Sequence, residues 1–140
     1  MSRLLNFSFS YLQREHFDVL DRAGILRNIP ASQRDRQTRL PIMKEDAEPE
    51  HVLQCVQDAI TEADPQADDV VVVSGVPDVV IYVVDLLWAM DPPPMVLVPL
   101  GRKRSRKGWT LQAFREVLPT EPTGKGVHIM AGENDGMADE

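Results

Sequence analysis

Four consecutive valines, residues 70–73, constrain most tightly how this chain can fold. Successive residues of a strand point to opposite sides of a sheet, so an unbroken β-branched run predicts a strand that is buried on both faces. Such strands are typical of parallel sheets that are covered by helices. With 140 residues, 43% of them hydrophobic, the chain is long enough to build one core of this kind.

The sequence around the valines predicts alternating helices and strands. Amphipathic spacing predicts helices at residues 11–23, 48–63, 77–90 and 111–118. Ser10 caps the first of these helices and Thr110 the last. Apolar runs predict further strands at residues 4–7, 25–29, 39–43, 95–98 and 127–130. One alternative stays open, because residues 70–84 also fit a valine-rich β-hairpin that turns at residues 74–78.

This order of elements predicts an α/β sandwich with a mostly parallel sheet. Residues 1–130 fit a single domain, and the small, acidic residues 131–140 predict a disordered tail. Ligands of such sheets bind outside the carboxyl ends of the strands. Three loops therefore share one edge of the predicted sheet: residues 6–10, 74–78 and 101–108.

Basic side chains are concentrated in one short segment of an acidic chain. Residues 102–107 hold five of the fifteen Lys and Arg residues, whereas residues 45–101 hold twelve acidic residues and no Lys or Arg. Such a cluster predicts either a local anion site or a solvated loop without a ligand. In an anion site, charge-assisted hydrogen bonds to phosphates would come from Arg102, Lys103, Arg104 and Arg106. The net charge of −7 argues against general binding of duplex DNA.

Small polar residues follow two of the predicted strands. One set forms the turn after the valine strand: Ser74, Gly75 and Val76. The other set alternates with two phenylalanines after the first strand: Asn6, Ser8 and Ser10. Glycine lets the backbone approach a ligand, and the free N–H groups of a helix start attract phosphate. Either both sets bind phosphate or ribose, or they only cap the turns.

Several classes of site lack their signatures. Neither a glycine-rich dinucleotide fingerprint nor a P-loop motif is present. His16, His51 and His128 have no metal-like spacing, and the single Cys55 excludes an intrachain disulfide and a cysteine-based zinc cluster. The sequence thus predicts no metal and no cofactor. It also lacks a signal peptide and an apolar run of about 20 residues, which predicts a soluble, cytoplasmic protein with no membrane partner.

The opening segment Leu4-Leu5-Asn6-Phe7-Ser8 resembles the start of a family of small CRISPR-associated ancillary proteins of type III systems. Members of this family begin with a hydrophobic strand that ends in Leu-Asn-Phe-Ser. The valine strand with its turn, and the proline-rich residues 91–94 that lead into a strand and a basic loop, fit the same pattern over residues 3–118. Where family members carry His-Pro after the motif, this chain has Phe9-Ser10.

The resemblance implies a small Rossmann-like three-layer sandwich related to the CARF ligand-sensing fold. It implies a homodimer or higher homo-oligomer that binds cyclic oligoadenylate, with cyclic tetra-adenylate as the expected ring, in type III CRISPR antiviral defence. The positions that match a ligand site are Asn6, Ser8, Ser74, Gly75 and Arg102. The protein would lower the signal by sequestration or, like relatives that are ring nucleases, by metal-independent cleavage. Lys103 and Arg104 are then the catalytic candidates.

Two other functions fit the same residues, so whether the protein is an enzyme stays open. The first is a small enzyme that handles nucleotides or nucleosides. The second is a non-enzymatic interaction protein whose basic loop docks against an acidic partner surface.

Overall fold

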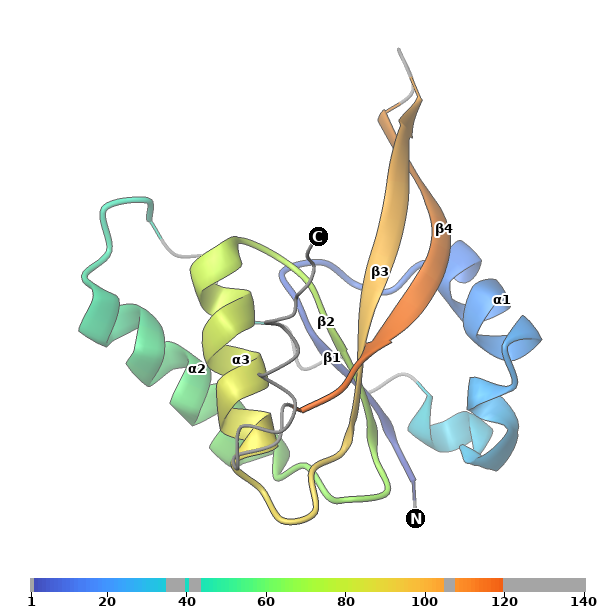
Figure 1. Cartoon of the computed structure of the whole chain (residues 1–140), viewed down its shortest axis with the longest axis horizontal. Helices are drawn as coiled ribbons and strands as arrows, with labels where there is room; N and C mark the ends of the chain where they lie inside the picture. Colours follow the sequence, from blue (N-terminus) through green and yellow to red (C-terminus); the bar gives the residue numbers. More distant parts are fainter. Residues whose placement is uncertain (1, 35–39, 41–43, 105–107, 120–140) are drawn as a thin grey trace, which may run out of the picture.

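The computed structural model describes residues 2–34, 40, 44–104 and 108–119. Strands and helices alternate through most of this part of the chain (Figure 1). In order they are β1 (Leu4–Phe7), α1 (Arg14–Arg22), the 3₁₀ helices η1 (Ile25–Asn28) and η2 (Ala31–Gln33), α2 (Pro49–Ala63), β2 (Val70–Val73), α3 (Pro77–Trp88), β3 (Met95–Arg104) and β4 (Gly108–Val117). The predicted α/β class is confirmed.

The described strands form one open sheet in the order β1-β2-β3-β4. β2 pairs in parallel with both β1 and β3, whereas β4 runs antiparallel to β3. The valine strand lies inside the sheet, as predicted, and all four of its residues are buried. The hairpin alternative for residues 70–84 is wrong, because the valines pair with β1 and β3 and the chain continues from them into α3.

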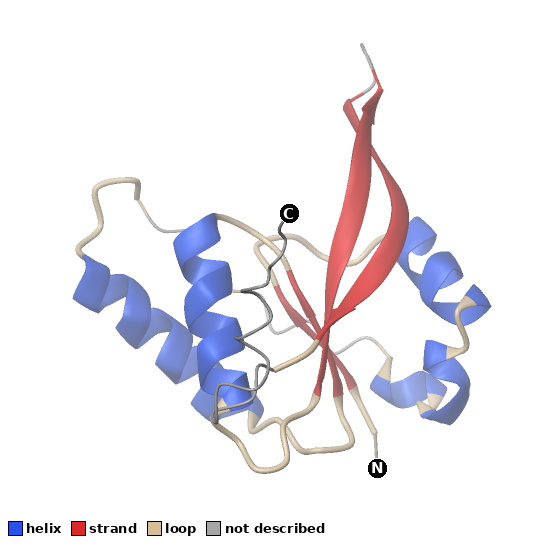
Figure 2. Ribbon diagram, in the orientation of Figure 1, coloured by secondary structure: helices blue, strands red, loops and turns tan. Residues whose placement is uncertain are grey.

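Helices cover both faces of the sheet (Figure 2). Alternate strand residues point to opposite faces, which divides the core into two clusters. The cluster under α2 and α3 contains Leu5, Phe7, Val71, Val73 and Val96 from the strands. The cluster under α1 and η1 contains Leu4, Val70, Val72 and Leu97. The continuous valine run is thus required by burial on both sides.

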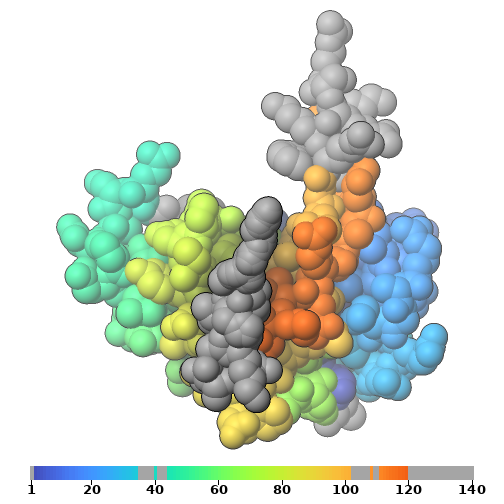
Figure 3. Space-filling view, viewed as in Figure 1, coloured from blue at the N-terminus to red at the C-terminus, as the bar shows by residue number. Residues whose placement is uncertain are grey.

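The largest departure from the predicted elements is a long hairpin. The strand predicted at residues 95–98 continues to Arg104, and the helix predicted at residues 111–118 is instead part of β4. The register shifts at Leu100/Gly101, which pair with Ala113 and Leu111, so Gln112 is an extra residue in a β-bulge. The bulge breaks the alternation of apolar residues along β4. The ends of the β3 and β4 ribbons stand clear of the helices in Figure 1, and Figure 3 shows that the rest of β4 adjoins α1 at the surface.

Two elements near the N-terminus also differ from prediction. Ser10 does not cap the first helix, which begins only at Arg14, because the N-cap residue is Gln13, whose backbone N–H is accepted by His16 Nδ1 at 2.9 Å. Residues 25–29 form the 3₁₀ helix η1 and its end rather than a strand. Leu26 and Ile29 are buried against the sheet, and a helical turn brings both to the same side.

Some predictions lie outside the described residues. They are the strand at residues 127–130, the tail at 131–140 and, except for the buried Leu40, the strand at 39–43.

Candidate functional site

A cleft of about 850 Å³ lies at the carboxyl ends of β1 and β2. The predicted loops contribute to it together: the segment after β1, the turn after β2 and the part of β3 next to the bulge. We call it the serine cleft, after the three serines that line it with Gly75 and Gly101: Ser8, Ser10 and Ser74. These three serines and two glycines all come from the loops predicted to bind a ligand, and they line the same cleft.

The side chain of Asn6 holds the segment after β1 in place through hydrogen bonds. This side chain is fully buried, and its Nδ2 donates to the Ser10 carbonyl at 2.8 Å. The Ser8 hydroxyl lies 2.7 Å from both Asn6 Oδ1 and the Ser10 carbonyl oxygen, and its single proton is donated to one of them at a time. Asn6 therefore positions this loop from the protein interior, whereas Ser8 and Ser10 line the cleft.

The turn after β2 presents a serine and an exposed backbone. The Ser74 hydroxyl is half-buried and has no hydrogen-bond partner among the described residues, so it is available to a ligand. Gly75 has φ of +140°, a conformation that side-chain-bearing residues rarely adopt. A Cβ atom at Gly75 would also lie 3.1 Å from the ring of Phe9. Glycine is thus required where the two loops meet.

The start of α3 is less suited to phosphate than its sequence suggested. Val76 is the N-cap residue and does not line the serine cleft. Asp78 lies in the first turn, and its Oδ1 accepts the backbone N–H of Val79 at 2.9 Å. A carboxylate here already serves the positive end of the helix dipole and repels a second anion.

Sequence reasoning missed residues that lie just before α1 and in its first turn. Tyr11, Gln13, Glu15 and His16 also line the serine cleft. His16 Nδ1 accepts the backbone N–H of Gln13 at 2.9 Å, so a neutral His16 ring carries its proton on Nε2. The sequence offered one signal for these residues: they follow β1 and therefore lie at the same edge of the sheet as Ser8.

The basic segment begins directly beyond the cleft. Gly101 lines the cleft, and Arg102, Lys103 and Arg104 follow it along β3, paired with Thr110, Trp109 and Gly108. A strand rises about 3.3 Å per residue, which places the backbone of Arg104 roughly 10 Å beyond Gly101. Arg102 is thus adjacent to the cleft, and the segment predicted as a loop is largely a β-ribbon. Arg106 lies outside the described residues.

Within the described ranges, no three His, Cys, Asp or Glu side chains are grouped as a metal site requires. In the same ranges, every helix is too short or too polar to cross a bilayer. In the comparisons with known proteins, no family model, curated protein or solved structure matches this chain.

Proposed function

We propose that the serine cleft binds a cyclic oligoadenylate, with cyclic tetra-adenylate as the preferred ring, and that the protein lowers this signal in type III CRISPR defence. The observation that carries the proposal is the convergence of Ser8, Ser10, Ser74 and Gly75 in one cleft that ends at Gly101, where the basic ribbon begins. These groups come from separate parts of the chain, and the cleft lies at the sheet edge where α/β folds bind ligands.

Each part of the cleft suits one part of a ring of adenylates. The Ser10 and Ser74 hydroxyls and the exposed backbone at Gly75 offer hydrogen bonds to phosphate and ribose oxygens. Tyr11 lines the cleft with 53% of its surface exposed, and its ring offers a stacking surface for an adenine base. Arg102 would supply positive charge to the phosphates from the cleft's outer end.

The proposal includes a dimer with a Rossmann-like, CARF-like arrangement. A cleft of about 850 Å³ falls within the range of about 300–1,000 Å³ that is typical of sites for single small molecules. A ring of four nucleotides is larger than such ligands. Two clefts related by a two-fold axis would each hold half of the ring, which matches the symmetry of the ligand. We place this dimer in the cytoplasm, in keeping with a single cysteine and no disulfide within the chain.

If the ring is cut, the reaction needs only groups of this chain, the substrate and solvent water. A ribose 2′-oxygen attacks the adjacent phosphorus, the bond to the 5′-oxygen breaks, and a 2′,3′-cyclic phosphate and a 5′-hydroxyl result. The 2′-hydroxyl proton leaves to solvent, and solvent returns a proton to the 5′-oxygen. The protein contributes alignment and stabilises the negative charge on the phosphate, through Lys103 or Arg104 and the Nε2–H of His16.

The test is incubation of the purified protein with labelled cyclic tetra-adenylate without added metal. A native gel reports binding, and thin-layer chromatography reports linear product. A shifted band with linear product indicates a ring nuclease, and a shifted band with intact ring indicates sequestration. The absence of both at micromolar protein would refute the proposal.

Matched variants locate the site. Replacing Arg102, Lys103 and Arg104 together with alanine should weaken binding by about 1–3 kcal/mol for each charge-assisted hydrogen bond that the substitutions remove. Arg115→Ala is the control, because it removes an exposed cation from the other end of the same hairpin. A loss of binding free energy per removed charge that is as large in Arg115→Ala as in the triple variant would assign the effect to net charge rather than to the ribbon.

A second candidate is an enzyme that handles a mononucleotide, which the volume of the serine cleft also favours. A thermal-shift panel separates the two, since stabilisation by a mononucleotide and none by the cyclic tetramer would select this function.

A further inference from the structure

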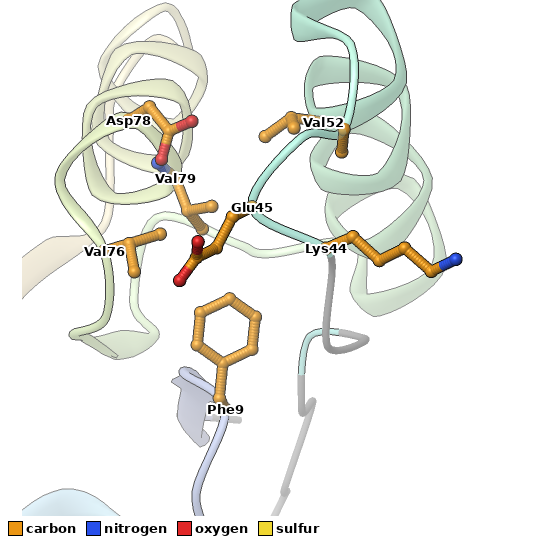
Figure 4. A pocket seen from close by; sticks show the side chains of 8 residues that line it. Phe9, Lys44, Glu45, Val52, Val76, Asp78 and Val79 are labelled. Carbon is orange, nitrogen blue, oxygen red and sulfur yellow. The ribbon is translucent and has the colours of Figure 1, made fainter.

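A second cavity, of about 520 Å³, lies between Phe9 in the segment after β1 and residues of α2 and α3 (Figure 4). Its apolar wall is formed by Phe9, Val52, Val76 and Val79, which come from the loop that follows β1, from α2 and from the start of α3. We call it the Phe9 pocket. It shares no lining residue with the serine cleft, so it is a separate site.

Two carboxylates lie at the Phe9 pocket. Glu45 is exposed, and among the described residues it has neither a hydrogen bond nor an ion pair. In Figure 4 its side chain points toward the ring of Phe9. Asp78 uses Oδ1 to accept the Val79 N–H, and its Oδ2 has no hydrogen-bond partner among the described residues, which leaves this oxygen for a ligand. Lys44 also lines the pocket, but its ammonium group points away from the other labelled side chains.

Among the described residues, the lining holds two carboxylates and one ammonium group, that of Lys44. Six of the eight lining residues belong to residues 45–101, which contain no Lys or Arg. A cation held beside Glu45 and Phe9 would be attracted both by the carboxylate and by the π-electrons of the ring. An apolar group next to that cation would cover Val52, Val76 and Val79, and the volume is within the range of small-molecule sites.

We propose that the Phe9 pocket binds a small organic cation that carries an apolar body, such as an arylalkylamine. The apolar wall takes the body, and Glu45 with Asp78 takes the ammonium group. This site does not depend on binding of a ring by the serine cleft.

The test compares three probes of nearly equal shape: phenethylammonium, phenethyl alcohol and phenylacetate. Binding is followed by the methyl NMR signals of Val52, Val76 and Val79. We expect saturable shifts with the ammonium probe, an affinity for the alcohol that is lower by about tenfold or more, and no binding of the carboxylate. Equal affinity for the three probes, or no shift with any, would overturn the proposal.

Variants test the carboxylates one at a time. Glu45→Gln and Asp78→Asn should each lower the affinity for the ammonium probe several-fold and leave the affinity for the alcohol unchanged. Glu62→Gln is the control, because it removes an exposed carboxylate from α2 outside the pocket. If Glu62→Gln weakens the probe as much as Glu45→Gln, long-range charge rather than this pocket explains the attraction. Unchanged amide spectra establish that each variant is folded.

Discussion

Replacing Asp69 with asparagine should destabilise the protein strongly, because this carboxylate joins β1, β2 and the end of α2. The Asp69 side chain is fully buried and accepts a hydrogen bond from the guanidinium of Arg3 at 2.6 Å. It also accepts hydrogen bonds from the backbone N–H groups of Arg3 at 3.0 Å and of Gln66 at 2.8 Å. Arg3 donates in turn to the carbonyls of Ala63 at 3.1 Å and Asp64 at 2.9 Å. One ion pair thus ties three segments together.

The expected magnitude follows from burial. Removing one partner of a buried ion pair costs about 3–5 kcal/mol, because the remaining charge is left without compensation. Arg3 keeps 17% of its side chain exposed and retains two carbonyl acceptors, which places Asp69→Asn near the lower limit, about 3 kcal/mol. For a chain of this length, that destabilisation lowers the melting temperature by roughly 10 °C.

The pH dependence has a definite sign. The hydrogen bond that Arg3 donates to Asp69 is the main cause that raises the pKa of Arg3 above its ordinary value, against a smaller opposing effect of burial. A group with a raised pKa stabilises the fold below its unfolded pKa, and this contribution is lost only as the pH rises through the folded value. Titration of Arg3 should therefore not alter stability near neutral pH.

Urea denaturation of a double-mutant cycle tests this reasoning. The variants are Asp69→Asn, Arg3→Met and the pair, with Asp68→Asn as control. The double variant should be more stable, by about 1–3 kcal/mol, than the sum of the two single changes in unfolding free energy predicts. Asp68 is exposed, and its replacement should change the free energy of unfolding by about 0.5 kcal/mol or less. Additive single effects, or an equally large effect at Asp68, would refute the account.

Three further predictions follow from burial and backbone geometry. Gly75→Ala should cost about 1–3 kcal/mol in urea denaturation, because φ is +140° and the new Cβ would crowd Phe9; a neutral effect would contradict this. Val83→Ala, at a fully buried site in α3, should cost about 2 kcal/mol, whereas Ile81→Ala, at a site 64% exposed on the same helix, should cost about 0.5 kcal/mol or less. Similar costs at the two sites would argue against the observed orientation of α3. Asn6→Ala should cost about 1–3 kcal/mol and weaken ligand binding without touching the ligand, and unchanged stability with unchanged binding would contradict its role in the loop.

Elements that are specified by their own residues could be predicted from the sequence, whereas elements that are specified by distant residues could not. The valine strand and α2 are specified by patterns within their own residues, and both lie where the sequence predicted them. β4 is specified by its pairing with β3, which no local pattern contains. Leu111, Phe114 and Val117 recur at a spacing of three, which is the spacing of a helix face, although in β4 Phe114 and Val117 pack against opposite core clusters.

The candidate site shows the same division. Ser8 and Ser74 could be placed at one edge from the rule that carboxyl ends of parallel strands meet there, and the serine cleft contains both. His16 and Tyr11 escaped notice because their place depends on where α1 begins. α1 begins at Arg14 because Gln13 is its N-cap residue and His16 Nδ1 accepts the Gln13 N–H, a pair that the usual preference for a serine cap does not reveal.

The most direct test of the central claim is isothermal titration calorimetry of the full chain with cyclic tetra-adenylate, repeated with Ser74→Trp, which fills the serine cleft. We predict saturable binding of one ring per two chains by the unmodified protein and an affinity that is lower by at least about tenfold in the variant. Absence of binding by the unmodified protein, or equal affinity of a folded Ser74→Trp variant, would contradict the assignment of the cleft.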